Sequence, residues 1–131
     1  MFSERYSLGE EIGRGTFGIV YKSIRMKMDM PVAVKTIDRS CLSESDEECI
    51  RKENAILELL NKGNGHPNVI AFYDFFEDLS TFFIVLELVN GGELFDRLVK
   101  KIFYSEKQSR DLVQVILLAV QHCHAHNVVH R

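Results

Sequence analysis

A glycine-rich segment near the start of the chain, "GRGTFGIV" at 13–20, constrains the fold more than any other feature. Glycines at G-x-G-x-x-G spacing bring backbone N–H groups close to a phosphate, and they do so in two settings. In dinucleotide-binding domains the loop leads from a strand into a helix, whereas elsewhere it joins two strands of a hairpin that covers the phosphates. The spacing alone does not distinguish these two settings, so the residues that flank the loop have to be considered.

The residues on both sides of the glycines predict strands. Side chains alternate with period 2 from Tyr6 to Ile12, and again through "IVYKSIR", which begins with two β-branched residues. Pro31 opens a third strand, "PVAVKTI". The loop therefore joins strand to strand, which argues against dinucleotide binding. An ordinary flexible hairpin is the structural alternative, but three glycines in eight residues would weaken it without benefit.

Downstream patterns predict a helix, two more strands and then a helical region. Ser45 and Glu48 form a capping-box pattern before an apolar stripe, and glycines at 63 and 65 end the helix. The stripe consists of Cys49, Ile50, Ile56, Leu57 and Leu60. "NVIAFYDFF" and "TFFIVLELV" are typical of strands, and "NGG" at 90–92 breaks the pattern before a short amphipathic "ELFDRLV". Ser105 with Gln108 caps a last helix, expected to run to about His122.

The composition narrows the class of protein. The 131 residues, 46% hydrophobic and 27% charged, suit one globular domain, and the net charge of -3 argues against a nucleic-acid binder. The first residues have no apolar core for a signal peptide, and the longest aliphatic run, 115–120, is too short to cross a bilayer. Three cysteines without C-x-x-C spacing indicate reduced thiols. We therefore expect a cytoplasmic protein that binds neither nucleic acid nor membrane.

Two charged residues interrupt apolar patterns. Lys35 shares a strand face with Ala33 and Ile37, where it faces either a pocket or solvent. Glu53 lies in the middle of the apolar helical stripe, and a buried unpaired carboxylate is costly, so it is expected to find a partner. Arg51 and Lys52 project elsewhere on the helix, which leaves Lys35 as the candidate. The alternative is a glutamate that reaches water at the edge of the stripe.

Taken together, these motifs resemble the eukaryotic protein kinase family. "GRGTFGIV" matches its glycine-rich loop, "VAVK" its phosphate-contacting lysine, and Glu53 in "ENAIL" the ion-pair partner of that lysine. "HPNVI", "LELV" and "GGELFDRL" also match in order and spacing, and "LELVNGGELFDRL" is most similar to the calcium/calmodulin-dependent kinase group. The resemblance implies a kinase-like small lobe, an antiparallel five-stranded sheet with one helix at 1–89, followed at 90–131 by the first helices of an incomplete large lobe.

The resemblance also implies a site for ATP. Ile12, Val20 and Ala33 would enclose the adenine, Leu86 would lie at the back, and backbone groups of Glu87 and Val89 would bind the base. Lys35, oriented by Glu53, would hold the α- and β-phosphates. Glu93 would contact the ribose or a basic residue of a peptide substrate. The loop residues that would cover the phosphates are Gly13, Arg14, Gly15, Thr16, Phe17 and Gly18.

The chain departs from the family pattern at "VVHR", His130 and Arg131, one residue before the catalytic aspartate of H-R-D-L-x-x-x-N. The magnesium-binding asparagine and the D-F-G aspartate do not follow, so no magnesium ligand is expected here. We expect the complete enzyme to transfer the γ-phosphoryl of Mg-ATP to protein serine or threonine hydroxyls, and this chain alone to be inactive. Two readings stay open: a fragment of a kinase, or a non-catalytic kinase-like protein that competes for kinase partners.

Three further segments have plain structural readings. His122 and His126 have metal-ligand spacing, but no carboxylate or well-placed thiol completes a set, so we predict no metal site. The acidic cluster "ESDEE" at 44–48 is expected to be a solvated helix start. The last helix is apolar almost all round between Leu112 and Cys123, as in helices buried inside bundles, so the isolated chain is expected to associate.

Overall fold

The computed structural model describes residues 1–16, 18–100 and 103–130 as a five-stranded antiparallel sheet with helices. The strands follow one another in space in the order β1-β2-β3-β5-β4. They are β1 Tyr6–Arg14, β2 Ile19–Arg25, β3 Met30–Asp38, β4 Phe72–Glu77 and β5 Thr81–Glu87. The α-helices are α1 Glu44–Leu60, α2 Leu94–Lys100 and α3 Glu106–Ala125, and short 3-10 turns are η1 Phe2–Glu4, η2 Met26–Met28 and η3 Arg39–Cys41. The predicted α+β architecture is confirmed.

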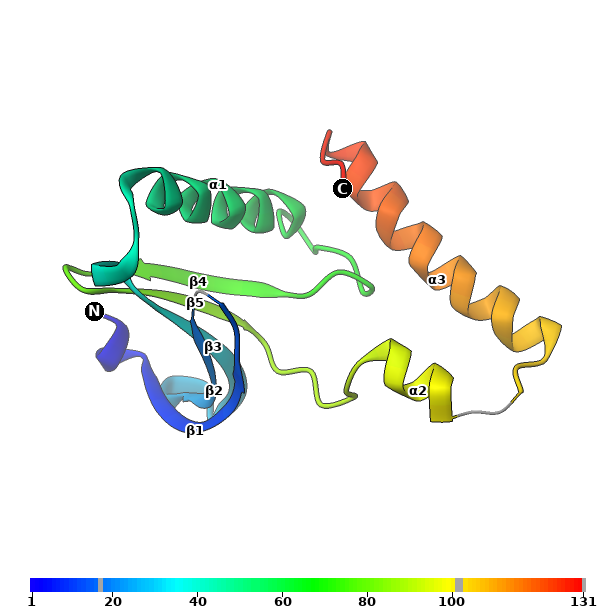
Figure 1. Cartoon of the computed structure of the whole chain (residues 1–131), viewed down its shortest axis with the longest axis horizontal. Coiled ribbons are helices and arrows are strands. Elements are labelled where there is room, and N and C mark those ends of the chain that lie inside the picture. Colours follow the sequence, from blue (N-terminus) through cyan, green and yellow to red (C-terminus); the bar gives the residue numbers. More distant parts are fainter. Residues whose placement is uncertain (17, 101–102, 131) are drawn as a thin grey trace.

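Each face of the sheet contributes to one buried cluster, because strand side chains alternate between the two faces. On one face Tyr6, Val32, Val34 and Val85 form a buried cluster, against which Phe2 of η1 packs. On the other face α1 lies along the sheet (Figure 1) and adds Ile50 to a second cluster. The other buried members of that second cluster are Ile37, Phe82 and Ile84. The face that carries α1 is also the one that Ala33, Lys35 and Ile37 share.

The start of α1 differs from the prediction by two residues. The N-cap is Ser43, whose Oγ accepts a hydrogen bond from the Asp46 N–H at 3.2 Å, while the Asp46 carboxylate accepts from the Ser43 N–H at 3.0 Å. Ser43/Asp46 and Ser45/Glu48 have the same spacing, so the pattern alone was ambiguous. The earlier start adds helical hydrogen bonds and puts three acidic residues in the first turn, where the helix dipole favours them.

The remaining boundaries follow the glycine and turn signals closely. Gly63 and Gly65 have left-handed φ angles of 72° and 59° just after α1, and Gly92 has 71° between β5 and α2. β4 begins at Phe72, later than predicted, because the Val69 N–H donates to the His66 carbonyl at 3.0 Å in a turn. The Ser105–Gln108 capping box of α3 is confirmed, and the helix continues three residues beyond His122.

Most of helix α3 extends away from the sheet, and the C-terminal end of α3 approaches the end of α1 (Figure 1). There His122 Nε2 donates to the Leu60 carbonyl at 2.8 Å, at the end of α1. No residue of α3, all of which is described, is buried. None of the helices in the described part of the chain combines the length and the apolar character that a bilayer span requires.

Candidate nucleotide-binding site

The glycine-rich loop closes the hairpin between β1 and β2. Gly13 pairs with Val20 and Arg14 with Ile19, and the Gly15 N–H donates to the Gly18 carbonyl at 2.8 Å. Thr16 is exposed, and Phe17, which the sequence also assigned to this loop, lies outside the described residues. Because β2 follows the loop directly, a helix that starts at Gly18 is ruled out, as is the dinucleotide-binding arrangement that needs it.

The three glycines of the loop are needed for different reasons. A Cβ on Gly18 would lie 2.3 Å from the Thr36 carbonyl oxygen, so packing against β3 demands glycine there. A Cβ on Gly13 or Gly15 would meet no described atom closer than 4.0 Å and 3.9 Å respectively, and neither residue has a left-handed φ angle. The fold therefore does not explain Gly13 and Gly15, whereas close approach of a ligand to their backbone would.

Strand register brings the central candidate residues to one face of the sheet. Val20 lies opposite Lys35, and Ala33 lies opposite Leu86. Directly opposed residues in an antiparallel pair project to the same face, and Ala33 and Lys35 are two residues apart. These four residues therefore line a common surface below the glycine-rich loop. Ala33 is buried and the other three are partly buried.

Lys35 and Glu53 line one small cavity of about 130 Å³ between β3 and α1, together with Asp46, Cys49, Ile37 and Ile50. Both side chains are described, and no ion pair joins them in this structure. Glu53 is exposed and Lys35 partly buried, so neither charge needs the other to avoid a desolvation penalty. The predicted pairing is thus not formed here, although both residues face the same cavity.

The other candidate residues lie on the open side of this surface. Ile12 is 47% exposed and Val89 62% exposed. The Glu87 N–H already donates to the Ala71 carbonyl at 2.8 Å, which leaves the Glu87 carbonyl for any contact with a base. Arg14 pairs with Glu11 on the exposed side of the loop, with 2.8 Å between Nη2 and Oε2. Glu93 is exposed just before α2.

An ion-pair network beside the site was not predicted. Glu47, expected to be solvated within "ESDEE", instead pairs with Arg39 and Arg51, and both arginines also reach Glu77. The Glu47–Arg51 pair has the i, i+4 spacing of helical ion pairs, and this was the one sequence signal that could have revealed part of the network. Its position shows that this part of the acidic segment faces the sheet rather than bulk water.

Histidines and acidic residues do not assemble a metal site in the described part of the chain. No group of three metal-ligating side chains occurs among those residues. The ring of His122 lies 5.0 Å from that of His66 and 4.5 Å from that of His126, and both His122 and His126 bond to backbone carbonyls. The described residues therefore do not fit the magnesium ion that the kinase resemblance implies.

Comparison with known proteins agrees with this geometry. A model of the protein kinase domain matches residues 6–131. The chain belongs to the protein kinase family. It is 39% identical over 128 residues to calcium-dependent protein kinase 24 and 41% identical over 127 residues to calcium-dependent protein kinase 8, both of Arabidopsis thaliana. It is also 40% identical over 126 residues to myosin light chain kinase A of Dictyostelium discoideum.

These alignments cover 96–97% of the chain but only part of each relative. The chain spans 22% and 23% of the two calcium-dependent kinases and 41% of the myosin light chain kinase. The resemblance to the kinase family is therefore confirmed along nearly the whole chain, which spans less than half of each of these relatives.

Proposed function

We propose that this chain is the ATP-binding part of a protein serine/threonine kinase, with residues 1–89 as the small lobe and hinge and 90–131 as the start of the large lobe. The whole enzyme transfers the γ-phosphoryl group of Mg-ATP to serine or threonine hydroxyls of protein substrates in the cytoplasm. One observation carries the ATP-binding assignment: Val20, Ala33, Lys35 and Leu86 share a sheet face below a loop in which a Cβ on Gly13 or Gly15 would meet no obstacle among the described residues.

Each residue group has a distinct role in this proposal. Val20, Ala33 and Leu86 supply apolar surface for the adenine, with Ile12 and Val89 closing over its edges. The Glu87 carbonyl and the Val89 backbone bind the base. The N–H groups of the glycine-rich loop and the Lys35 ammonium bind phosphate oxygens, and Glu53 orients Lys35. Glu93 contacts the ribose or a basic substrate residue.

The serine/threonine class rests on similarity rather than on site geometry. "GGELFDRL" resembles the corresponding segment of calcium/calmodulin-dependent kinases, and the relatives above include calcium-dependent protein kinases and a myosin light chain kinase. Unpaired exposed thiols at Cys41 and Cys49 are consistent with a cytoplasmic protein.

Nucleotide binding is tested by titrating the 131-residue chain with a fluorescent ATP analogue. We expect Lys35→Met to weaken binding at least about tenfold, since a charge-assisted contact to phosphate is worth about 1.5–3 kcal/mol. Lys27→Met removes the same charge at the exposed β2–β3 turn and serves as the matched control. Equal affinity of the two variants would contradict the proposed site.

Phosphotransfer is tested separately with radiolabelled ATP and a protein acceptor. We expect no turnover by the 131-residue chain alone, because the aspartate and asparagine of the family's catalytic loop are not among its residues. Their loss removes several orders of magnitude in rate. Turnover that exceeds a Lys35→Met control would show that the chain supplies these functions in another way.

A further inference from the structure

We infer that Arg39, Glu47, Arg51 and Glu77 form an ion-pair clamp that fixes the rotation of α1 about its axis and thereby directs Glu53 toward Lys35. These four are positioning residues, since none of them lines the cavity that holds Lys35 and Glu53. The inference rests on the proposed function, because the approach of Glu53 to Lys35 matters only if Lys35 binds nucleotide.

The clamp ties α1 to two other segments of the small lobe. Arg39, in η3 after β3, binds both oxygens of Glu47, with Nε–Oε1 at 2.8 Å and Nη2–Oε2 at 2.9 Å. Arg51 Nη2 lies 2.8 Å from Glu47 Oε2 and 2.6 Å from Glu77 Oε1. Glu77 is the last residue of β4. Arg39 also reaches Glu77 at 3.2 Å and donates to the Asp78 carbonyl. Removing either carboxylate therefore opens a connection between helix and sheet.

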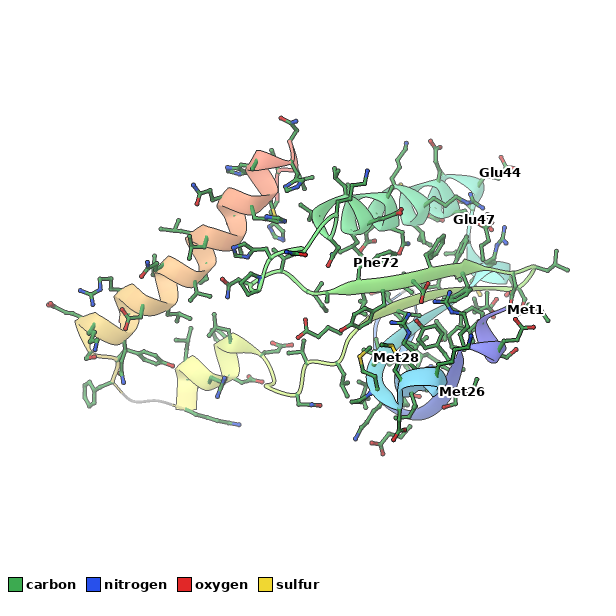
Figure 2. All side chains as sticks on the ribbon, turned by 180° about the vertical axis from the view of Figure 1, so that it is seen from behind. Met1, Met26, Met28, Glu44, Glu47 and Phe72 are labelled. Carbon is green, nitrogen blue, oxygen red and sulfur yellow. The ribbon has the colours of Figure 1, made fainter. Side chains whose placement is uncertain are left out.

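An aromatic ring supports both cations. The guanidinium carbons of Arg39 and Arg51 lie 4.7 Å and 5.4 Å from the centre of the Phe82 ring, which is fully buried in the cluster below α1. Guanidinium groups stack favourably on aromatic faces at such distances. Figure 2 shows Glu47 on the side of α1 that faces the strands, whereas Glu44 lies at the start of the helix.

Helix geometry explains how such a clamp would control Glu53. At about 3.6 residues per turn, Glu47 and Arg51 lie on one flank of the buried residues Ile50 and Asn54, and Glu53 lies on the other flank, about 120° from Glu47. Rotation of α1 in either direction moves the two flanks oppositely relative to the sheet. Holding the Glu47 flank therefore fixes the direction in which Glu53 points.

The packed face of α1 offers little else to fix that rotation. Only Ile50, Asn54 and Leu60 of the helix are buried, and the Asn54 Oδ1 atom has no hydrogen-bond partner in the structure. Apolar contacts are not directional, and an unpaired buried acceptor does not favour one orientation over its neighbours. At the C-terminal end of α1, the Oδ1 of the C-cap Asn61 accepts a hydrogen bond from the Phe72 N–H at 3.1 Å. In the N-terminal half of the helix, the directional side-chain bonds to η3 and the sheet are those of the clamp.

A second ion pair on α1 provides a matched control. The Lys52 Nζ and Glu48 Oε1 atoms are also 2.8 Å apart, but the two side chains are 68% and 65% exposed and the pair lies within the helix. In the clamp, Glu47 is 19% and Arg39 21% exposed. Exposed pairs contribute little, so Glu48→Gln changes the charge of the helix by the same amount without releasing it.

The test compares Glu47→Gln with Glu48→Gln in the 131-residue chain by two measurements. The first is affinity for a fluorescent ATP analogue, which we expect to fall at least about fivefold for Glu47→Gln alone, the lower end of typical coupling between sites. The second is cross-linking of Cys49 to Lys35 with a short maleimide–succinimide reagent, read by peptide mass spectrometry and normalised to maleimide labelling of Cys49. Both residues line the same cavity, so the yield reports the rotation of α1 without nucleotide.

The outcomes separate this inference from the proposed function. If the unmodified chain does not bind nucleotide, the proposed function fails, while the cross-linking still tests the clamp. Cross-linking and affinity that are the same for both variants would overturn the inference. We expect the cross-linking yield to be lower for Glu47→Gln than for Glu48→Gln. If Glu47→Gln is too unstable to purify, Glu77→Gln opens the clamp from the sheet side and must lower the yield in the same way.

Discussion

At the scale of single residues, the glycines show how one residue type serves different purposes in one hairpin. A Cβ on Gly9 of β1 would lie 2.3 Å from the Lys22 carbonyl oxygen, and one on Gly18 equally close to the Thr36 carbonyl oxygen. Gly9 is not part of the G-x-G-x-x-G pattern, yet the pairing of β1 with β2 depends on it. Gly13 and Gly15 meet no such obstacle among the described residues.

This difference predicts opposite results for alanine substitutions. Gly9→Ala and Gly18→Ala should lower the free energy of unfolding by about 1–3 kcal/mol, since the backbone must shift to admit a methyl group. Gly13→Ala and Gly15→Ala should leave stability within about 0.5 kcal/mol and instead weaken binding of an ATP analogue. Urea denaturation and nucleotide titration of all four variants check the split. Loss of stability at Gly15 with unchanged affinity would contradict it.

Tyr6 is a second residue whose environment makes a prediction. It is 1% exposed, and burial, followed by its hydrogen bond to Asp74, raises the pKa of its hydroxyl to about 12. Because this pKa lies above the ordinary value of 10.0, the neutral form is favoured in the folded state. The resulting stability is fully present below about pH 10 and is lost as pH rises through about 12.

Alkaline titration should therefore show one tyrosine that ionises late and unfolds the chain as it does so. We expect stability to fall by roughly 2–3 kcal/mol across that interval, since each pKa unit corresponds to about 1.4 kcal/mol. Tyr6→Phe should abolish this alkaline loss, whereas Tyr73→Phe, a change in the same apolar cluster, should keep it. Ultraviolet absorbance and circular dichroism measured over the same pH series provide the test.

At the scale of elements, α1 is defined by its cap and by the clamp. Hydrogen bonds from Ser43 lower the pKa of Asp46, and Arg39 and Arg51 lower those of Glu47 and Glu77 respectively. A carboxyl group whose pKa is lowered by folding stabilises the folded state at pH values above its pKa in the unfolded chain. This stabilisation is lost as the pH falls through the pKa of the group in the folded state. Acidification should therefore release α1 from the sheet below about pH 4.

The cap itself can be tested by comparing two serines. Ser43→Ala should lower the free energy of unfolding by about 1 kcal/mol, the usual effect of removing an N-cap side chain. Ser45→Ala should have a much smaller effect, because Ser45 lies in the first turn and does not cap it. Thermal denaturation of both variants measures the difference. A larger loss at Ser45 would show that the helix begins two residues later in solution.

At the scale of the whole molecule, the sheet with α1 forms a packed unit, and α3 does not share its core. Five apolar residues of α3 are between 41% and 61% exposed: Val113, Val115, Ile116, Leu117 and Leu118. Arg110, Gln114 and Gln121 border the exposed apolar side chains of Val113, Leu117 and Leu118 on this helix. Such continuous apolar surface drives association, at roughly 25 cal/mol per Å².

The 131-residue chain should consequently self-associate through α3. We expect Val113→Lys combined with Leu117→Lys to shift it toward monomer in size-exclusion chromatography and sedimentation. Ser3→Lys combined with Asn64→Lys adds the same charge at exposed positions of the small lobe and controls for repulsion alone. A monomeric unmodified chain at high concentration, or equal effects of the two pairs, would contradict this account.

Local sequence patterns were sufficient to predict the elements and the surface that they form. The glycine-rich loop between two alternating strands, the capped helices and the common face of Ala33, Lys35 and Ile37 follow from local rules of period and turn chemistry. Because those rules relate residues that are only a few positions apart, they predict the same local structure however the chain packs. Alternation together with antiparallel pairing was sufficient to bring Val20 and Leu86 to the same face as Lys35.

The rotation of α1 on that surface could not be predicted from local patterns. Glu53 appeared to need Lys35 because it interrupts an apolar stripe, but it is exposed and unpaired, since Ile56 in that stripe is itself 42% exposed. Glu47, within a run of acidic residues, faces the sheet and binds Arg39 and Arg51. Helical period fixes which residues share a flank. The rotation that turns one flank inward depends on contacts with η3, just before the helix, and with β4, which lies 26 residues along the chain from Arg51 to Glu77.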